Sequence, residues 1–378
     1  MAGAHDIAWP TLEAAAIEAG FDTFGVTSAD PFHTLIPFLE AYYQEGRESG
    51  FEHPLSALRW NPRALFPEAQ SIVAVALPYE TEAGRRLRHP SFRHGIVSRY
   101  AWGSDYHKVM RDKLQDLASR LSARSGRELH TLACVDTSSL VDRAVALRAG
   151  IGWIGKNAML ITKKYGSYVF LGALLLDASI EPEPVNHTEF DDCGACTLCL
   201  QACPTGALVD EGVLDGKKCL SGITQYKGVI PEEYRRPLGR RVWGCDTCQT
   251  VCPKNRLTLV SLAKEFVPDP ELSFPDLTAL LHMSARQFRA AYGHTAAAWR
   301  GHQVLRRNAI IALANARDLS ALPDLIELLA DPRPEIRGSA AWALRCLDPL
   351  KSREEVRRAW QCEDDESVKL EMIWAVTD

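Results

Sequence analysis

The sequence predicts a multidomain α+β protein, with an α/β domain first, a cysteine-rich module in the middle and an all-helical domain last. Three observations predict this arrangement. The chain has 378 residues, which is too long for one typical hydrophobic core. Short strand patterns mix with helix patterns early in the chain, whereas only helix patterns follow from about residue 276. Between these regions lies a segment that holds eight of the eleven cysteines.

The first domain, residues 1–180, is predicted from short apolar runs. Runs rich in β-branched or bulky apolar residues read as buried strands over residues 71–77, 129–135 and 168–176. Apolar spacing predicts helices over residues 11–20 and 141–149, the second of which ends at a glycine C-cap signal. Strands mixed with helices favour an α/β or α+β domain, with a strand order that the sequence leaves open.

The module, residues 181–268, follows a proline-rich linker and carries two cysteine runs. The first run is Cys193-x2-Cys196-x2-Cys199-x3-Cys203-Pro, which is the bacterial ferredoxin spacing. In that spacing three thiolates bind one 4Fe–4S cluster and the fourth serves the other cluster. The second run has the same ending but lacks its first cysteine, and Cys219 is available to fill the vacancy. Two clusters need eight ligands, and the two runs together with Cys219 supply eight cysteines.

We therefore expect a ferredoxin-like module with two 4Fe–4S clusters that accept electrons from a soluble low-potential donor. Zinc is the competing interpretation, but zinc sites use paired C-x2-C knuckles rather than this run. The cysteines outside the pattern, Cys134, Cys346 and Cys362, are expected to be buried thiols. The predicted ligands of cluster one are Cys193, Cys196, Cys199 and Cys252, and those of cluster two are Cys203, Cys219, Cys245 and Cys248.

The last domain, residues 276–378, is predicted to be a HEAT-like helical repeat. Helix patterns recur over residues 304–315, 321–330, 335–346 and 353–360. The segment Asp331-Pro332-Arg333-Pro334 separates the second pattern from the third, as in HEAT-type repeats. An ordinary helical bundle is the alternative.

The charge and hydropathy of the sequence limit the kinds of partner that we expect. The chain has 43 basic and 48 acidic residues, yet residues 284–317 hold six arginines and no acid. An arginine-rich stretch on an acidic protein predicts a face for phosphate, with a solvated helix face as the alternative. No apolar run is long enough to span a bilayer, and residues 1–10 lack the apolar core of a signal peptide. We expect a cytoplasmic monomer that does not bind membranes.

Three further strings carry a family resemblance. They are Arg99-Tyr100-Ala101-Trp102-Gly103-Ser104-Asp105-Tyr106-His107, Asp136-Thr137-Ser138 and the segment GIGWIGKN at residues 150–157. With both cysteine runs and Arg306-Arg307-Asn308-Ala309, this ordered set closely resembles the epoxyqueuosine reductases over nearly the whole chain. The resemblance implies reduction of epoxyqueuosine to queuosine at the wobble position of the tRNA anticodon loop. That reaction is the last step of queuosine biosynthesis, and it uses cobalamin and two 4Fe–4S clusters.

Two other functions compete with this one. A reductive dehalogenase-like corrinoid enzyme acting on a small molecule would share the cobalamin domain and the clusters. It is disfavoured because the chain shows no export signal and has an arginine-rich helical tail. A non-catalytic electron carrier would not need so large a first domain.

The resemblance also implies a cobalamin-binding role for the first domain and roles for particular residues. Asp136 is the predicted proton donor, since it follows the strand predicted at residues 129–135 and a strand end is a usual place for a catalytic group. Burial against an apolar corrin face is expected to raise its pKa. A helix N-cap for residues 141–149, or an Asx-turn with Ser138, is the alternative role for Asp136. Predicted cofactor contacts are Arg59, Ala101, Asp136, Lys156, Ser221, Thr224 and Gln225, and predicted tRNA contacts are Arg300, Arg306 and Arg307.

Overall fold

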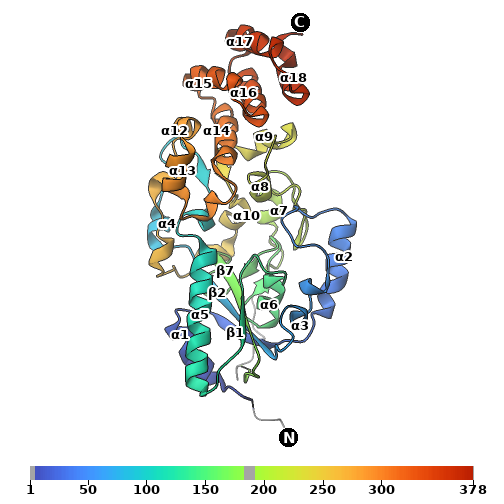
Figure 1. The fold of residues 1–378 in the computed structure, drawn as a ribbon, viewed down its shortest axis with the longest axis vertical. Coiled ribbons are helices and arrows are strands. Elements are labelled where there is room, and N and C mark those ends of the chain that lie inside the picture. The colour runs from blue at the N-terminus through green and yellow to red at the C-terminus, as the bar shows by residue number, and fades with distance from the viewer. Residues whose placement is uncertain (1–4, 183–191, 378) are drawn as a thin grey trace. The chain divides into compact units, whose positions relative to one another are not determined.

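The computed structural model describes residues 5–182 and 192–377, so most of the predicted linker lies outside the described residues. The chain forms two compact units, each built from three segments of the sequence (Figure 1). Unit 1 comprises Met1–Glu82, Asp105–Lys217 and Thr247–Phe266, and unit 2 comprises Ala83–Ser104, Lys218–Asp246 and Val267–Asp378. The predicted α+β class is confirmed. The predicted domain boundaries near residues 180 and 268 stay predictions. The two units are defined by spatial contacts and combine segments that are distant in sequence, so they do not test boundaries along the chain.

Unit 1 is organised around a four-stranded antiparallel sheet in the order β1-β2-β7-β4. Three of these strands match the predicted runs: β2 (Ser71–Pro78), β4 (Thr131–Cys134) and β7 (Val169–Leu176). The edge strand β1 (Phe24–Ser28) was not predicted. Every residue of β2 is buried, as expected for a strand covered on both faces.

Helices cover both faces of this sheet (Figure 1). On one face lie α1 (Trp9–Glu18) and the long α5 (Tyr106–Ser125), and on the other lies α6 (Asp142–Arg148). Helix α5 approaches the sheet closely at Gly172, where a Cβ atom would meet Met110 Cε at 2.6 Å. Helix α5 was not predicted from the sequence, although its buried side chains recur at helical spacing: Met110, Leu114, Leu117 and Leu121.

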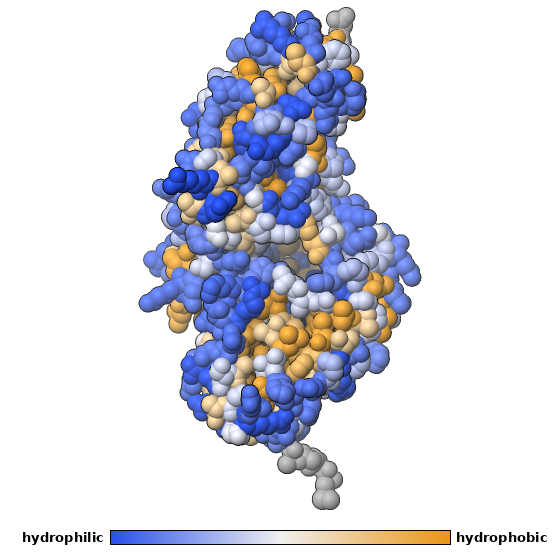
Figure 2. Space-filling model, in the orientation of Figure 1, coloured by the Kyte–Doolittle hydropathy of each residue, from blue (hydrophilic) through white to orange (hydrophobic). Residues whose placement is uncertain are grey.

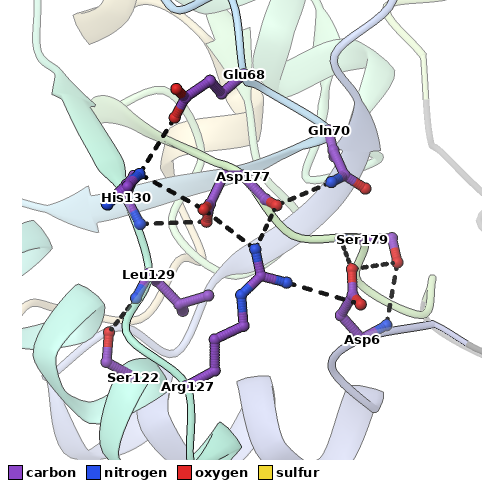
Figure 3. A network of polar contacts seen from close by, with 9 residues as sticks. All are labelled: Asp6, Glu68, Gln70, Ser122, Arg127, Leu129, His130, Asp177 and Ser179. Atoms are coloured by element: carbon purple, nitrogen blue, oxygen red, sulfur yellow. Dashed lines mark hydrogen bonds and ion pairs between the residues drawn. The ribbon is translucent and has the colours of Figure 1, made fainter.

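A polar network closes the end of the sheet where β4 begins (Figure 3). The Arg127 guanidinium donates to the backbone oxygen of Asp177 at 2.9 Å and pairs with its carboxylate at 3.1 Å. The backbone N–H of His130 donates to the same carboxylate at 3.2 Å. His130 directly precedes β4, whereas Asp136 follows it, so the network holds the end of the strand that lies away from Asp136.

Unit 2 combines a short parallel ribbon with the helical repeat. The ribbon pairs β3 (Ile96–Val97) with β10 (Arg241–Trp243). The predicted HEAT-type helices are present as α14 (His302–Ala316), α15 (Leu322–Glu327), α16 (Pro334–Leu347) and α17 (Pro349–Gln361), and α18 (Glu366–Met372) follows them. None of the helices among the described residues is both long enough and apolar enough to cross a membrane.

Candidate functional site

The four predicted ligands of cluster one line a single pocket in unit 1. They share it with Lys156, Asn157, Ile161, Leu198, Pro253 and Lys254. The loop that carries Cys193, Cys196 and Cys199 is tightly turned, with the Cys196 N–H donating to the Cys193 oxygen at 3.0 Å. The Lys156 N–H approaches Cys193 Sγ at 3.5 Å. Four sulfur ligands around one pocket fit a cubane cluster.

The predicted ligands of cluster two are divided between the two units. Cys203 and Cys248 belong to unit 1, and Cys219 and Cys245 belong to unit 2. All four are half-buried. The Ala207 N–H donates to Cys203 Sγ at 3.2 Å, a contact that favours a thiolate. Outside the two sets, Cys134 is buried as expected, but Cys362 is exposed, which corrects the expectation of a buried thiol.

Asp136 stands at the end of β4 in a conformation that its neighbours hold. Its backbone φ is +44°, a left-handed value that costs a non-glycine residue about 1–3 kcal/mol. Tyr106 donates its hydroxyl to Asp136 Oδ2 at 2.8 Å, and His107 Nε2 lies 3.1 Å from the same oxygen. The Tyr106 ring stacks on Phe170 of β7 with centroids 4.2 Å apart. The backbone strain is thus located at Asp136, whose carboxylate is oriented by Tyr106 and His107.

Asp105 completes a chain of three polar side chains. It caps α5 by accepting from the His107 N–H at 3.0 Å, and the same Oδ1 lies 2.7 Å from His107 Nδ1. Both ring nitrogens of His107 therefore face carboxylates. The sequence reading did not assign catalytic roles to Asp105 and His107, although the Asp-x-His spacing at the start of a helix could have suggested the pair.

This arrangement places the transferable proton on the histidine. Burial alone would lower the pKa of His107, but its hydrogen bonds to Asp105 and Asp136 raise it to about 9. Burial would raise the pKa of Asp136, yet the hydrogen bonds from His107 and Tyr106 outweigh it and hold that pKa below its usual range. The upward shift of the Asp136 pKa expected from burial against a corrin face stays a prediction. The N-cap alternative is wrong, because Val141 is the N-cap of α6.

Near Asp136 in sequence or charge, three buried polar atoms lack a hydrogen-bond partner among the described residues. They are Arg59 Nε, Ser138 Oγ and Asp142 Oδ1. Burial and the neighbouring Asp136 raise the pKa of Asp142 to about 7. Buried polar groups are nearly always satisfied by protein, water or a ligand, so these atoms can accept a water molecule or a ligand as partner.

The other predicted cofactor residues have varied surroundings. Lys156 lies at the cluster-one pocket, with Nζ 2.8 Å from the Gly194 oxygen and 2.5 Å from Glu211. Ala101 is buried in a short helix of unit 2. Thr224 is fully buried, and its hydroxyl donates to the Ser221 oxygen while accepting from the Gly244 N–H. Gln225 also donates to the Ser221 oxygen and accepts from the Trp299 indole N–H.

The predicted tRNA arginines differ sharply in exposure. Arg307 is 1% exposed and donates to the backbone oxygens of Tyr226 and Gly228. A guanidinium held inside unit 2 cannot reach phosphate, so Arg307 is a structural residue, which corrects that expectation. Arg306 is largely buried and pairs with Asp331 at 2.6 Å. Arg300 is half-buried and lies 4.5 Å from the ring centroid of the exposed Trp299.

Comparison with known families agrees with this geometry. A family model described as "Epoxyqueuosine reductase QueG, DUF1730" matches residues 59–137. A model of a 4Fe-4S double cluster binding domain matches residues 192–255, and one of HEAT repeats matches residues 296–377. The first of these spans Asp136 and the Asp105–His107 segment, and the second spans all eight predicted cluster ligands.

Similar proteins extend the match over almost the whole chain. The epoxyqueuosine reductase of Bacillus subtilis (strain 168) is 46% identical over 358 residues, covering 93% of this chain and 91% of the relative. The epoxyqueuosine reductase of Listeria monocytogenes is 45% identical over 363 residues, covering 96% and 95%.

Solved structures give the same result. A crystal structure of epoxyqueuosine reductase with an epoxyqueuosine-modified tRNA-Tyr stem loop matches with a TM-score of 0.92, 44% identity and 97% coverage of both chains. Another structure, from Bacillus subtilis, has its catalytic aspartate loop swung out of the active site and matches with a TM-score of 0.90. Identity at this level over nearly the full length shows that this chain belongs to the epoxyqueuosine reductase family, as a reductase with a 4Fe–4S double cluster domain.

Proposed function

We propose that this protein reduces epoxyqueuosine to queuosine in the anticodon loop of tRNA, in the cytoplasm. The observation that carries the proposal is the Asp105–His107–Asp136 chain, which ends on an aspartate with positive φ. A relative described with its catalytic aspartate on a movable loop supports the same role for Asp136. Overall, an epoxide, two electrons and two protons give an alkene and water.

The protein side chains serve the oxygen that leaves the epoxide ring. Opening the ring develops negative charge on that oxygen, and a placed acid removes the cost of forming a free alkoxide. The proton resting on His107 Nε2 passes first to Asp136 Oδ2, and the carboxylic acid so formed then protonates the leaving oxygen. The second proton needed to release water comes from solvent. Asp105 holds the imidazole in place and stabilises its charged form. Tyr106 keeps the Asp136 carboxylate oriented.

The electrons pass through two 4Fe–4S clusters in this proposal. Cluster one takes Cys193, Cys196, Cys199 and Cys252, which already line one pocket. Cluster two takes Cys203, Cys219, Cys245 and Cys248. Support for the second set comes from the ligand count and from the double-cluster family model, which spans all eight cysteines.

Cobalamin is proposed as the group that meets the epoxide. Arg59 and Ser138 would help to hold it, and it would supply a low-potential centre for reduction of the epoxide. Two features of unit 1 fit a large amphipathic ligand. Arg59 Nε and Ser138 Oγ are buried without partners among the described residues. Hydrophobic residues also gather on the visible face over α2 (Ile36–Gln44), α3 (Pro62–Leu65) and α6 (Figure 2). Helix α2 also exposes Phe38, and α6 exposes Leu147.

We propose tRNA as the substrate because a similar solved protein holds a modified tRNA stem loop. In unit 2, Trp299 is 57% exposed and lies beside Arg300, a pairing that can stack on an unpaired base. Arg286 and Arg289 are exposed on α13 (Ala285–Tyr292) and offer charge for phosphate. These exposed residues replace Arg307 as the proposed contacts.

The direct test is mass analysis of an epoxyqueuosine-containing anticodon stem loop after incubation with reduced enzyme under anaerobic conditions. Loss of one oxygen atom from the modified base is expected. If the mass does not change although the enzyme holds both clusters and shows corrin absorption, the proposed reaction is wrong.

A further inference from the structure

Unit 1 exposes three leucines on one short segment that follows the cluster-one ligand Cys252. Leu257 is 100% exposed, Leu259 is 61% exposed and Leu262 is 92% exposed. Single exposed leucines are ordinary on a protein surface, but three within six residues of one segment concentrate apolar surface, and concentrated apolar surface is typical of an interaction site. We call Leu257, Leu259 and Leu262 the leucine patch.

The backbone of the patch is fixed, so the exposure is a property of the fold. The Leu259 N–H donates to the Lys164 oxygen at 2.9 Å, and the Ser261 N–H donates to the Glu80 oxygen at 2.7 Å. Beyond the patch, Phe266 is buried against Phe170 with ring centroids 5.1 Å apart. Both ends are therefore anchored to unit 1 while the leucines between them face outward.

The surroundings of the patch are basic. Arg256 and Lys264 flank it in sequence, and Lys163 and Lys164 lie beside it through the Leu259 hydrogen bond. All four basic residues are exposed, and Glu265 is the exposed acid within the segment. An apolar centre with a basic rim is complementary to a protein whose own apolar spot has an acidic rim.

The patch is also close to cluster one along a rigid path. Cys252, Pro253 and Lys254 line the cluster pocket. The next residue, Asn255, is buried and accepts from the Ser167 N–H at 2.8 Å. Leu257 follows Cys252 by five residues, so the two Cα atoms lie within roughly 18 Å even for an extended chain.

We propose that the leucine patch is the docking surface for an acidic one-electron carrier protein, which reduces cluster one there. The inference rests on the proposed function, in which the clusters must be refilled with electrons. At each encounter the carrier loses one electron and cluster one gains it, so two encounters supply one epoxide reduction. Small, electrostatically steered interfaces are typical of electron-transfer complexes.

Two other occupants fit less well. RNA-binding surfaces stack bases on aromatic side chains, and the patch consists of leucines. A second copy of this chain would bring one basic rim against another, which opposes a symmetric pairing. The experiment below distinguishes all three occupants.

The test follows the reduction of the clusters by stopped-flow absorbance without tRNA. The probe is a reduced acidic flavodoxin, whose hydroquinone becomes a coloured semiquinone when it gives up one electron. Two variants are compared with wild type: L257S/L262S removes the apolar centre, and R256E/K264E reverses the rim charge. A matched control, L350S, changes an exposed leucine of the helical repeat.

Both patch variants should lower the second-order rate of reduction by flavodoxin at least about 10-fold, and R256E/K264E should also flatten its salt dependence. Reduction by dithionite, iron content and tRNA affinity should match wild type, and L350S should match it throughout. An unchanged flavodoxin rate overturns the proposal. A fall in tRNA affinity instead assigns the patch to RNA, and loss of a wild-type dimer assigns it to self-association. Because the readout is cluster reduction alone, failure of epoxide chemistry would leave the docking result intact.

Discussion

The cluster-one pocket and the Asp136 site are both in unit 1, but the sequence specifies them in different ways. The predicted ligands in the pocket are all cysteines, and three of the four come from a single seven-residue run with fixed spacing. The Asp136 site depends on partners from a distant helix that set its charge and aim. The comparison shows that cysteine spacing in the sequence can predict cluster ligands. The protonation state of the Asp136 carboxyl group, by contrast, depends on which side chains the fold brings beside it.

The largest expected effect is at the pocket. Cys252→Ala removes the one cluster-one ligand that lies outside the first run, so iron should fall from about eight to about four atoms per chain. Reductase activity should be abolished because the electron path is broken. Cys362→Ala is the matched control, since this cysteine is exposed and outside both sets. Iron analysis that finds about eight atoms in Cys252→Ala would remove it from the ligand set.

At the Asp136 site, Asp136→Asn should keep iron, fold and tRNA affinity but lower single-turnover reduction by about 10²–10⁴-fold. Asparagine has nearly the same shape and no carboxyl proton to transfer. Measuring the rate with fully reduced enzyme separates proton delivery from electron supply. A rate within a few-fold of wild type would exclude Asp136 as the proton donor.

His107→Gln tests where the proton rests. In wild type the single-turnover rate should hold at neutral pH and fall as the pH rises through about 9, because His107 then loses its proton. The variant should be slower by about 10–100-fold and lack this alkaline limb. His107→Ala serves as a comparison, since a purely structural role predicts that glutamine restores activity at every pH.

The same histidine should also give a pH-dependent stability. Its folded-state pKa of about 9 lies above the ordinary value near 6.5, so its contribution is fully present below about pH 6.5 and disappears as the pH rises through about 9. The melting temperature of His107→Gln should therefore lie below wild type at pH 6 and approach it near pH 10. A constant difference across this range would contradict the raised pKa.

The smallest effect on the enzyme is expected from changing Lys156. The sequence analysis predicted that this residue contacts the corrin, whereas in the structure it lines the cluster-one pocket. Lys156→Met removes the contacts to the Gly194 oxygen and Glu211. Cluster one should lose iron a few-fold faster in the presence of a chelator, while corrin binding stays unchanged. Weakened corrin binding with normal cluster lifetime would return Lys156 to its earlier assignment.

Elements with strong local signals could be predicted from sequence, and those that depend on neighbours could not. The buried runs that became β2 and β7 needed only composition. The edge strand β1 has five residues of which only Gly25 is buried, so its pattern is faint. Arg306 and Arg307 look equally available in sequence, yet packing in unit 2 buries Arg307 almost completely. His107 was not recognised from the sequence as a partner of Asp136, so its lowering effect on the Asp136 pKa was not predicted.

The interleaving of the two units constrains how the protein is made. The chain passes to the other unit after Glu82, Ser104, Lys217, Asp246 and Phe266, so a single cut cannot yield either unit as a continuous fragment. During synthesis at roughly 5–20 residues per second, Cys252 emerges about 3–10 seconds after Cys199. In the proposed ligand set, three cluster-one thiolates therefore precede their fourth ligand, so completion of that cluster would follow translation of the second cysteine run.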